Sequence, residues 1–420
     1  QQAYIKKEFH ASDDKEFTYE DVKRGYFRLL SGNMISEIIP HAVFNPEDDT
    51  YDLHLKVKLE DNISVRIGGN VSTTSSNQIY LGLSYQNLNY NAKEFTFDGQ
   101  LGKIYNNVQL MGKIDFATSI PTSYRLIASI STFDYFKKEK LFSRNDKPAF
   151  NQKDERFVKL KVGLPFLSNK RAEFGVGAAK IQDRYFQKNV IDFDKDKYDK
   201  STYSLFGGSI SFNGSTLNSR QFPTQGAHEE LVAQIFTGKE CFYPGESSDN
   251  KKASEERHSW LQLSYMKEKY HRMAEHWTLG WYLKALYSSR NFSENYTATM
   301  MQAGEFAPTA HGQLMYNEAF RANQFVGVGV RPIYRFNQMF HVRGEFYGFM
   351  PIFPIERNSI NKAYYGKAFS RFEYLGEVSV VCQLPFGAIS AYVNHYSSPK
   401  REWNVGLTLG WQLFNYRFFE

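Results

Sequence analysis

The sequence predicts a mainly β protein: a 16-stranded transmembrane antiparallel β-barrel over residues 62–420, preceded by one small α+β domain over residues 1–61. Three observations predict this fold. Apolar and polar side chains alternate with a period of two along most of the chain, the connections alternate in length, and 16% of residues are aromatic although the mean hydropathy is negative. In a barrel only alternate residues meet lipid, so this combination is expected. A large soluble sandwich or lectin-like domain is the alternative fold.

The stretch Trp403–Leu413 shows the alternation most clearly. Odd-numbered positions are apolar, and even-numbered positions are small or polar, so one face of a strand is wholly apolar. The span matches the roughly 9–11 residues that a tilted strand needs to cross a bilayer. Because Phe418 and Phe419 follow closely, we expect the last strand to end in aromatic residues and to close the barrel against the first strand.

Composition excludes some functions and leaves others open. The net charge of +6 is mild and spread over 51 basic and 45 acidic residues, which gives no basic face for nucleic acid. Cys241 and Cys382 have no metal or redox spacing, and a disulfide between them is permitted in an oxidising compartment but is not inferred. No cofactor or metal is predicted. The start at Gln1 indicates either a cleaved signal or a larger N-terminal part outside this sequence.

The first 61 residues predict a small water-soluble module. Thr18 is a plausible cap of a helix with an acidic first turn, whose apolar stripe (Val22, Tyr26, Phe27, Leu29, Leu30) ends at Gly32. A second short helix is expected over Met34–Ile39, before Pro40. A hairpin then follows, with its turn over residues 45–49. Its second strand, Tyr51–Glu60, is apolar on one face and charged on the other.

From Ile63 onward the two-residue period recurs almost everywhere, and we count sixteen strands, an even number as antiparallel closure requires. The fourteen clear stretches are 63–67, 79–85, 108–116, 124–130, 158–164, 172–178, 231–235, 261–265, 277–287, 326–330, 340–346, 378–382, 389–393 and 403–413. Three weaker candidates lie near Phe95–Leu101, Tyr203–Phe212 and Phe372–Tyr374, so the stretches exceed the sixteen strands by one.

The connections sort by length, which a soluble sandwich does not require. Short turns are expected at 106–107, 165–169 and 384–387, and long polar loops at 137–154, 183–201, 239–256, 290–321 and 351–368. Short turns on the periplasmic side and long loops outside are typical of outer-membrane barrels. The charged run Asp192–Lys200 is interpreted as a solvated loop tip, with a lipid-headgroup site as the alternative.

Charged residues within the strands are predicted to line the lumen, because they would be costly against lipid. We expect them to form a static ion-pair network that fills the barrel rather than a selective pore. These residues are Arg66, Lys113, Arg125, Lys159, Lys161, Glu230, Lys284, Arg331, Glu345 and Glu377.

Several stretches of the sequence resemble known families. Residues 19–30, 38–40 and 51–55 resemble a POTRA domain, and Asn218–Gly226 resembles a periplasmic turn of the bacterial surface-antigen superfamily of barrels. That superfamily includes barrel-assembly factors and two-partner secretion transporters, and its barrels have sixteen strands. A single POTRA domain before such a barrel is most similar to the C-terminal half of outer-membrane patatin-like phospholipases; residues 320–325 and 342–347 resemble the same group. The resemblance implies the outer membrane of a Gram-negative bacterium, with the POTRA domain in the periplasm.

Two departures from these families bear on function. The superfamily's sixth outer loop usually carries an Arg-Gly-Phe/Tyr tip that enters the lumen and pairs with an inner-wall acid, and Arg290–Arg321 contains no such tripeptide. A patatin enzyme needs a Gly-x-Ser-x-Gly elbow, and the nearest string, Gly207–Ser211, lacks the second glycine. We therefore predict no catalytic residue within 1–420. His271 and His276 are five apart, which disfavours a zinc site and favours a polar periplasmic turn.

Three functions follow as hypotheses. The chain anchors or translocates an N-terminal patatin-like lipid hydrolase that lies outside this sequence; or it is a barrel-assembly or secretion-type transporter with a weak seam between the first and last strands; or it is a non-enzymatic subunit of a larger outer-membrane complex. We prefer the first. The expected partners are outer-membrane lipids including lipopolysaccharide, and proteins bound through the POTRA domain or the outer loops, without nucleic acid.

Overall fold

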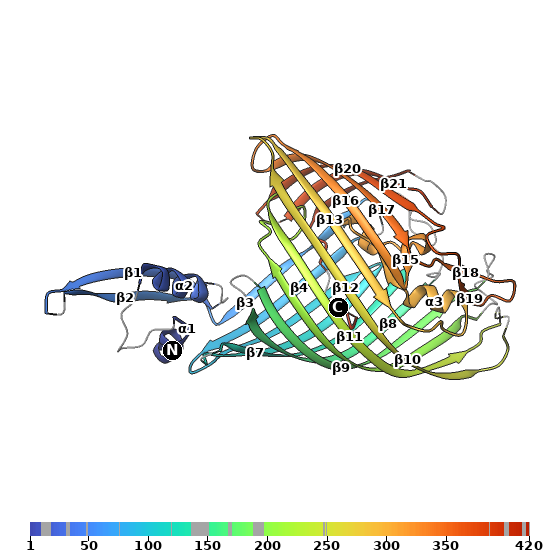
Figure 1. The fold of residues 1–420 in the computed structure, drawn as a ribbon, viewed down its shortest axis with the longest axis horizontal. Helices are drawn as coiled ribbons and strands as arrows, with labels where there is room; N and C mark the ends of the chain where they lie inside the picture. The colour runs from blue at the N-terminus through green and yellow to red at the C-terminus, as the bar shows by residue number, and fades with distance from the viewer. Residues whose placement is uncertain are drawn as a thin grey trace.

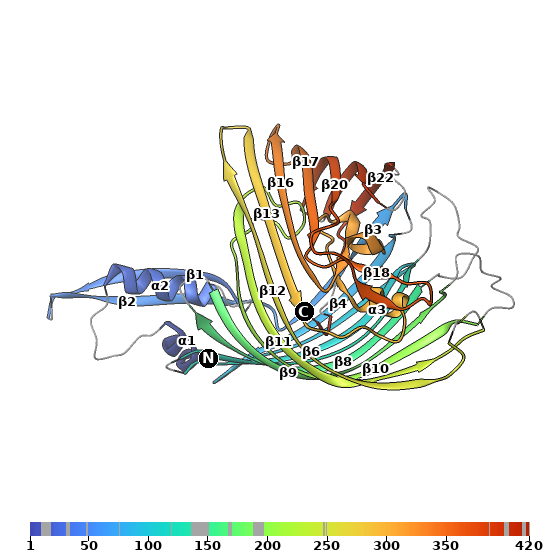
Figure 2. The same ribbon diagram turned by 45° about the vertical axis from the view of Figure 1, so that its right-hand side comes forward.

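The structure is a computed structural model, and it shows a small N-terminal unit beside one end of a large closed barrel (Figures 1 and 2). It describes residues 1–9, 18–30, 34–47, 49–74, 76–118, 120–135, 151–166, 170–187, 197–246, 248, 250–385, 387–398, 403–413 and 417–419. Phe17, Gly32, Asp48 and parts of the connections predicted at 137–154, 165–169, 183–201, 239–256 and 384–387 lie outside these residues. Within them, no helix is long and apolar enough to cross a bilayer.

The N-terminal unit contains two helices, α1 (Gln2–Phe9) and α2 (Tyr19–Leu30), and a hairpin of β1 (Ile35–Asn45) and β2 (Thr50–Leu59). The cap at Thr18 is confirmed, because its Oγ1 accepts a hydrogen bond from the Asp21 backbone amide at 3.3 Å and its own amide donates to Oδ2 of Asp21 at 3.1 Å. The side chains of Phe27 and Leu30 lie outside the described part of the chain.

The helix predicted over Met34–Ile39 is wrong, because these residues open strand β1, which continues through Pro40. Ile35 and Ile38 are buried against α1 and α2, together with the apolar face of β2 (Leu53, Leu55, Val57, Leu59). The β-branched residues pair with β2 and fill this core, so tertiary contacts decide for the strand. Proline is tolerated here because the sheet has only two strands, both of them edges.

The barrel has sixteen antiparallel strands, as predicted. In chain order they are β3 (Ile63–Ser72), β4 (Gln78–Leu88), β5 (Ala92–Gly102), β6 (Tyr105–Phe116), β7 (Thr122–Tyr135), β8 (Asn151–Phe166), β9 (Lys170–Tyr185), β10 (Asp199–Ser215), β11 (Gly226–Tyr243), β12 (Ser254–Arg272), β13 (Trp277–Ser288), β16 (Gln324–Arg335), β17 (Phe340–Pro351), β20 (Glu373–Leu384), β21 (Gly387–Tyr396) and β22 (Trp403–Gly410). Phe372–Tyr374 is not a separate strand, because residue 373 begins β20.

We call the end of the barrel that carries the N-terminal unit the near end, and the opposite end the far end. The connections that were predicted to be long join strand ends at the far end, whereas the connection between β10 and β11, residues 216–225, lies at the near end. The turn predicted at Asn106–Asn107 is wrong: both residues belong to β6, and the short connection is Lys103–Ile104 at the far end. The Asn107 side chain faces inward and donates to Oγ of Ser129 at 2.9 Å, so a polar lumen residue was mistaken for a turn residue.

Several far-end loops are shorter than predicted because the strands continue beyond their apolar part. Strands β8 to β12 have 16 to 19 residues each, and they include polar segments such as 239–243 and 254–256 that were assigned to a loop. The connection between β13 and β16 instead carries structure of its own: helix α3 (Tyr296–Gln302), the turns η1 (His311–Leu314) and η2 (Glu318–Phe320), and the paired short strands β14 (Gly304–Glu305) and β15 (Arg321–Ala322). A further hairpin, β18 (Ile355–Arg357) with β19 (Ala363–Tyr365), follows β17.

The outer surface of the barrel is an exposed apolar band. Outward positions are occupied by residues such as Ile67, Leu126, Val158, Phe346 and Leu407, each more than 40% exposed. A closed cylinder satisfies its own backbone hydrogen bonds, and an apolar band of this extent fits hydrocarbon better than water.

Candidate functional site

The lumen wall carries the charges that the sequence predicted for it. All ten predicted residues face inward, and most are engaged there: Arg66 pairs with Asp98 at 3.3 Å, and Arg125 and Lys161 both pair with Glu173. Lys284 donates to the Glu305 carbonyl at 3.0 Å. The inward face of an alternating strand is where charge is tolerated in a membrane barrel, so the pattern alone locates these side chains.

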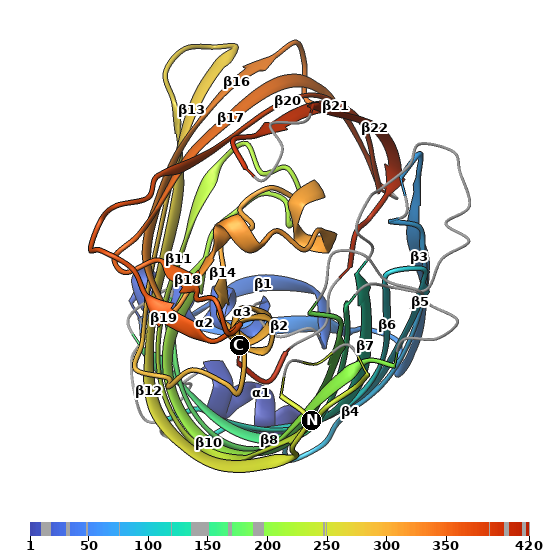
Figure 3. The same ribbon diagram turned by 90° about the vertical axis from the view of Figure 1, so that its right-hand side faces the viewer.

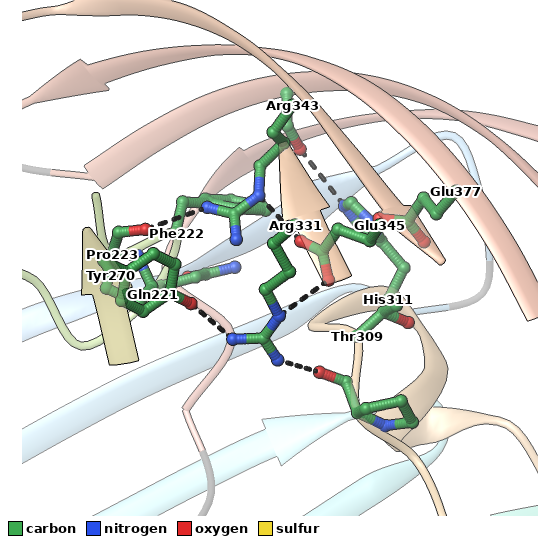
Figure 4. A network of polar contacts seen from close by, with 12 residues as sticks. Gln221, Phe222, Pro223, Tyr270, Thr309, His311, Arg331, Arg343, Glu345 and Glu377 are labelled. Atoms are coloured by element: carbon green, nitrogen blue, oxygen red, sulfur yellow. Dashed lines mark hydrogen bonds and ion pairs between the residues drawn. The ribbon is translucent and has the colours of Figure 1, made fainter. Parts of the chain in front are cut away.

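A deeply buried part of this wall is an arginine–glutamate cluster on β16 and β17 (Figure 4). Glu345 lies between two guanidinium groups, with its Oε1 2.7 Å from Nε of Arg343 and its Oε2 3.6 Å from Nε of Arg331. Arg331 also donates to the Tyr347 hydroxyl at 2.6 Å and pairs with Glu268. The exposed fractions of Arg343, Glu345 and Arg331 are 1%, 3% and 4%. Charges this deeply buried persist only when paired, which agrees with the predicted static network.

The sixth far-end connection, residues 289–323, folds into the lumen, where Figure 3 shows α3 inside the ring of strands. All seven residues of α3 are buried. The helix is capped by Asn295, whose side chain also donates to the Tyr185 hydroxyl on β9 at 2.7 Å, and Gln302 at its other end donates to Asp183 at 2.5 Å. In the same connection, burial raises the pKa of the Glu318 carboxyl. The contacts of Asn295 with Tyr185 and of Gln302 with Asp183 hold the connection against the wall of the barrel.

The tip of this connection is joined to the last strands of the barrel through His311. Its Nδ1 lies 2.7 Å from Oε1 of Glu377 on β20, and its Nε2 lies 3.2 Å from Oγ of Ser390 on β21. Ser390 is in turn 2.5 Å from Oγ1 of Thr408 on β22. We call these four residues the latch. The sequence showed no Arg-Gly-Phe/Tyr tip, yet the connection enters the lumen, where its His311 contacts Glu377, an acid of the inner wall.

The latch has the residue types of a serine hydrolase triad, but its surroundings disfavour catalysis. The exposed fractions of Ser390 and Glu377 are 0% and 1%, and the ring of Tyr392 stacks on His311 with centroids 3.7 Å apart. Ser390 lies in a regular strand paired on both sides, not on an exposed strand–helix turn. A substrate has no access to this hydroxyl, so the contacts hold the connection against the wall.

The C-terminal segment also enters the lumen, contrary to the expectation that the last strand ends in aromatic residues. Strand β22 ends at Gly410, and Phe418 is 1% exposed within a cluster of inward side chains on β7 to β12, including Phe157 and Phe236. Its backbone amide donates to Oε1 of Glu155 at 2.7 Å, and Nζ of Lys159 donates to the Arg417 carbonyl at 2.9 Å. The segment thus crosses from β22 to the opposite wall.

The change of direction at Gly410 leaves a short seam between the last and first strands. Among the described residues, the ladder between β22 and β3 has three residue pairs, over Thr408–Gly410 and Asn70–Ser72, whereas β3 and β4 share eight. Two backbone hydrogen bonds flank this ladder, from Thr73 to the Leu407 carbonyl at 3.0 Å and from Trp411 to the Gly69 carbonyl at 2.8 Å. Gly410 has φ +113°, and a Cβ there would lie 2.1 Å from the carbonyl oxygen of Gly69. The segment Ile63–Gly68 pairs with β4, but among the described residues no strand pairs with its other edge.

The remaining sequence candidates are not brought together into a site. Gly207–Ser211 lies within β10, as predicted. His271 is the penultimate residue of β12, and His276 belongs to the following turn, where its Nδ1 lies 2.9 Å from the Arg335 carbonyl. Cys241 on β11 and Cys382 on β20 are free thiols on separated strands. Across the described ranges, no group of metal-binding side chains gathers.

Comparison with known proteins identifies the architecture. No protein-family model matches the chain, and no curated protein sequence matches it. Among solved structures, BamA from Haemophilus ducreyi lacking POTRA domains 1–3 aligns with a TM-score of 0.62 over 98% of this chain and 81% of that chain, at 13% identity. The chain therefore has the same fold as the barrel of this BamA. CdiB from Acinetobacter baumannii (TM-score 0.55, 7% identity) and CdiB from Escherichia coli (0.53, 9%) also align over 98% of this chain, covering 71% and 74% of their own.

Sequence reasoning located the wall and missed the seam's geometry, the latch and the lumen-bound C-terminus. The alternation of side chains carries no information about a bend at one glycine among 29. His311 had no local signal either, because its partners Glu377, Ser390 and Thr408 come from three different strands.

Proposed function

We propose that the chain is an outer-membrane barrel of the assembly or secretion type, in which a β-segment of a client protein pairs with the first strand at the seam. The short seam between β22 and β3 is the single observation that carries this proposal. The comparison with BamA and CdiB supports it better than it supports an anchor for a patatin-like hydrolase. No described residue favours the hydrolase anchor, which stays a prediction.

The near end faces the periplasm in this proposal, and residues 1–61 are a POTRA domain. The alignment with BamA covers 98% of the chain, so it extends into the N-terminal unit, which supports this assignment. The long far-end connections then face outward, as in outer-membrane barrels generally.

The unpaired edge of β3 gives the proposal its physical basis. Backbone amides and carbonyls without partners cost several kcal/mol each in hydrocarbon, so the segment Ile63–Gly68 is unstable beside lipid unless another strand covers it. Its outward side chains Ile63, Val65 and Ile67 are 67%, 59% and 81% exposed. Strand addition to an open sheet edge satisfies the backbone groups without regard to client sequence.

In this proposal the seam between β22 and β3 opens, and the latch controls that opening together with the sixth connection and the C-terminal segment, which occupy the lumen. Thr408 belongs to the seam through its pairing with Ser72, and to the latch through Ser390. A sixth connection that leaves the lumen would therefore withdraw contacts from the strand that must separate. Because the connection and the C-terminal segment occupy the lumen, passive diffusion through an open pore is disfavoured as a function.

The test locks the seam. In a chain with Cys241 and Cys382 replaced by serine, Ser72→Cys and Thr408→Cys introduce a disulfide between directly opposed residues. The matched control, Ser209→Cys with Gln234→Cys, places the same crosslink between β10 and β11. The protein is reconstituted in liposomes, and the folding rate of a urea-unfolded outer-membrane barrel is followed by its heat-modifiable mobility.

We expect the unlocked protein to accelerate folding, the oxidised seam to reduce that acceleration at least tenfold, and a reductant to restore it. The control crosslink should have no effect. Equal acceleration by the oxidised and reduced seam variants would refute strand exchange at this seam.

A further inference from the structure

A polar cavity of ≈550 Å³ lies at the near end of the barrel, apart from the seam and the latch. It is bounded by the β12–β13 turn, the β16–β17 turn and the connection between β10 and β11. Its lining includes Arg272, Glu275, His276, Arg335 and His341. Arg272, Arg335 and His341 occupy the same inward faces of β12, β16 and β17 as the buried Tyr270, Ile333 and Arg343, two residues away on their strands. The cavity therefore belongs to the mouth of the lumen rather than to the lipid-facing surface.

The cavity has an uncompensated positive charge. Arg272 donates to the backbone carbonyls of Ala274 and Glu275 at 3.4 and 3.3 Å, and Arg335 donates to the Glu275 carbonyl at 3.1 Å. Across the described part of the chain, neither guanidinium has an ion pair with a carboxylate, whereas Arg331 and Arg343 are both paired. Glu275 is the single acidic residue in the lining. Two cations therefore face one carboxylate.

Two buried nitrogen atoms in the lining also have no partner. His341 is 2% exposed, and its Nε2 has no hydrogen-bond partner. Nε of Arg335 is buried and has no hydrogen-bond partner either. A buried polar atom without a partner costs roughly 1–3 kcal/mol, and structures usually avoid this. An oxyanion in the cavity would offset the charge of the two guanidinium groups.

We propose that this cavity binds carboxylates of an acidic segment in a partner or client polypeptide arriving from the periplasm. Its position at the periplasmic mouth rests on the proposed function. The volume exceeds that of a single small ion and accommodates several side chains. The amide side chains of Gln225 and Gln338 also line the wall and suit a peptide backbone. The inward location argues against a membrane lipid.

The experiment measures binding of fluorescein-labelled hexaglutamate to the full chain in detergent micelles by fluorescence anisotropy, with labelled hexaglutamine as the neutral probe. Arg272→Gln with Arg335→Gln removes both cations. Lys252→Gln with Arg257→Gln is the matched control, because it removes two exposed cations from the far end, on β12 and the connection before it. Heat-modifiable mobility verifies that each variant is folded. Arg272→Lys with Arg335→Lys retains the charge if the glutamine pair fails to fold.

We expect hexaglutamate to bind at least tenfold more tightly than hexaglutamine, and the Arg272/Arg335 glutamine pair to lose at least tenfold in affinity while the far-end control is unchanged. The lysine pair should keep most of the affinity. Equal affinity of the Arg272/Arg335 glutamine variant and the Lys252/Arg257 glutamine control for hexaglutamate would overturn the proposal. So would inorganic phosphate that binds as tightly as hexaglutamate, or anionic phosphatidylglycerol vesicles that abolish peptide binding at equal charge concentration. The seam-locked protein should bind hexaglutamate normally, so loss of assembly activity and loss of this site are separate results.

Discussion

Removal of Glu345 should destabilise the barrel more than any exposed substitution, because this carboxylate neutralises two buried arginines. Glu345 is 3% exposed, lies 2.7 Å from Arg343 and 3.6 Å from Arg331, and also accepts from Tyr347. Glu345→Ala leaves two guanidinium groups, 1% and 4% exposed, around a vacated site. Breaking a buried pair by removing one partner costs about 3–5 kcal/mol.

The loss corresponds to roughly a 100- to 4,000-fold fall in the folded-to-unfolded ratio. Urea unfolding of the full chain in detergent micelles, followed by tryptophan fluorescence, measures it. Arg331 retains Glu268 and the Tyr347 hydroxyl, so Arg343 should account for most of the effect. If so, Arg343→Met added to Glu345→Ala should recover part of the lost stability.

Glu255→Ala is the matched control, since Glu255 pairs with Lys239 on the exposed surface, where ion pairs contribute about 0–1 kcal/mol. A Glu345→Ala variant within 1 kcal/mol of the parent would refute the reasoning, since it would mean that water reaches the two arginines and that this part of the lumen is not filled.

Three further predictions concern the seam and the lumen. Gly410→Ala should weaken the seam by about 1–3 kcal/mol, because φ +113° and the carbonyl of Gly69 exclude a Cβ; faster loss of a Ser72–Thr408 cysteine crosslink under reductant would measure it. His311→Ala should release the sixth connection, because Glu377 then keeps Asn394 as its hydrogen-bond partner among the described residues but no contact with the connection; hydrogen exchange over residues 296–320 should rise at least tenfold. Phe418→Asp should expel the C-terminal segment from its aromatic cluster, so carboxypeptidase should trim this variant but not the parent.

Each of these predictions has a control within the chain. Gly112→Ala adds a Cβ where no atom lies within 4 Å, so it should leave the seam unchanged. His276→Ala removes an exposed histidine from a turn and should not alter exchange in the sixth connection. Phe336→Asp replaces a phenylalanine that is 58% exposed, and should leave the C-terminal segment protected. An unchanged exchange rate in His311→Ala would show that α3 alone holds the connection.

The alternation of side chains determined the wall of this protein from sequence alone. Because a strand places successive residues on opposite faces, the pattern fixed which residues face outward and which charges face the lumen, from Arg66 on β3 to Glu377 on β20. The pattern could not distinguish polar side chains that face the lumen from polar side chains in a loop. Asn106–Asn107 and residues 239–243 were therefore assigned to connections although they belong to strands. The β-branched run at Ile35–Ile39 was misassigned because its burial depends on a hairpin partner.

Only the tertiary structure decided how the cylinder closes and what fills it. The pairing of the last strand with the first was predicted, but the side-chain pattern does not encode the backbone turn at Gly410, where the ladder between β22 and β3 ends. The filling depends on contacts between residues far apart in the chain, such as His311 with Glu377 and Phe418 with Glu155. Local sequence specifies a strand because its two faces meet different solvents. It does not specify which segments share an interior that all sixteen strands enclose.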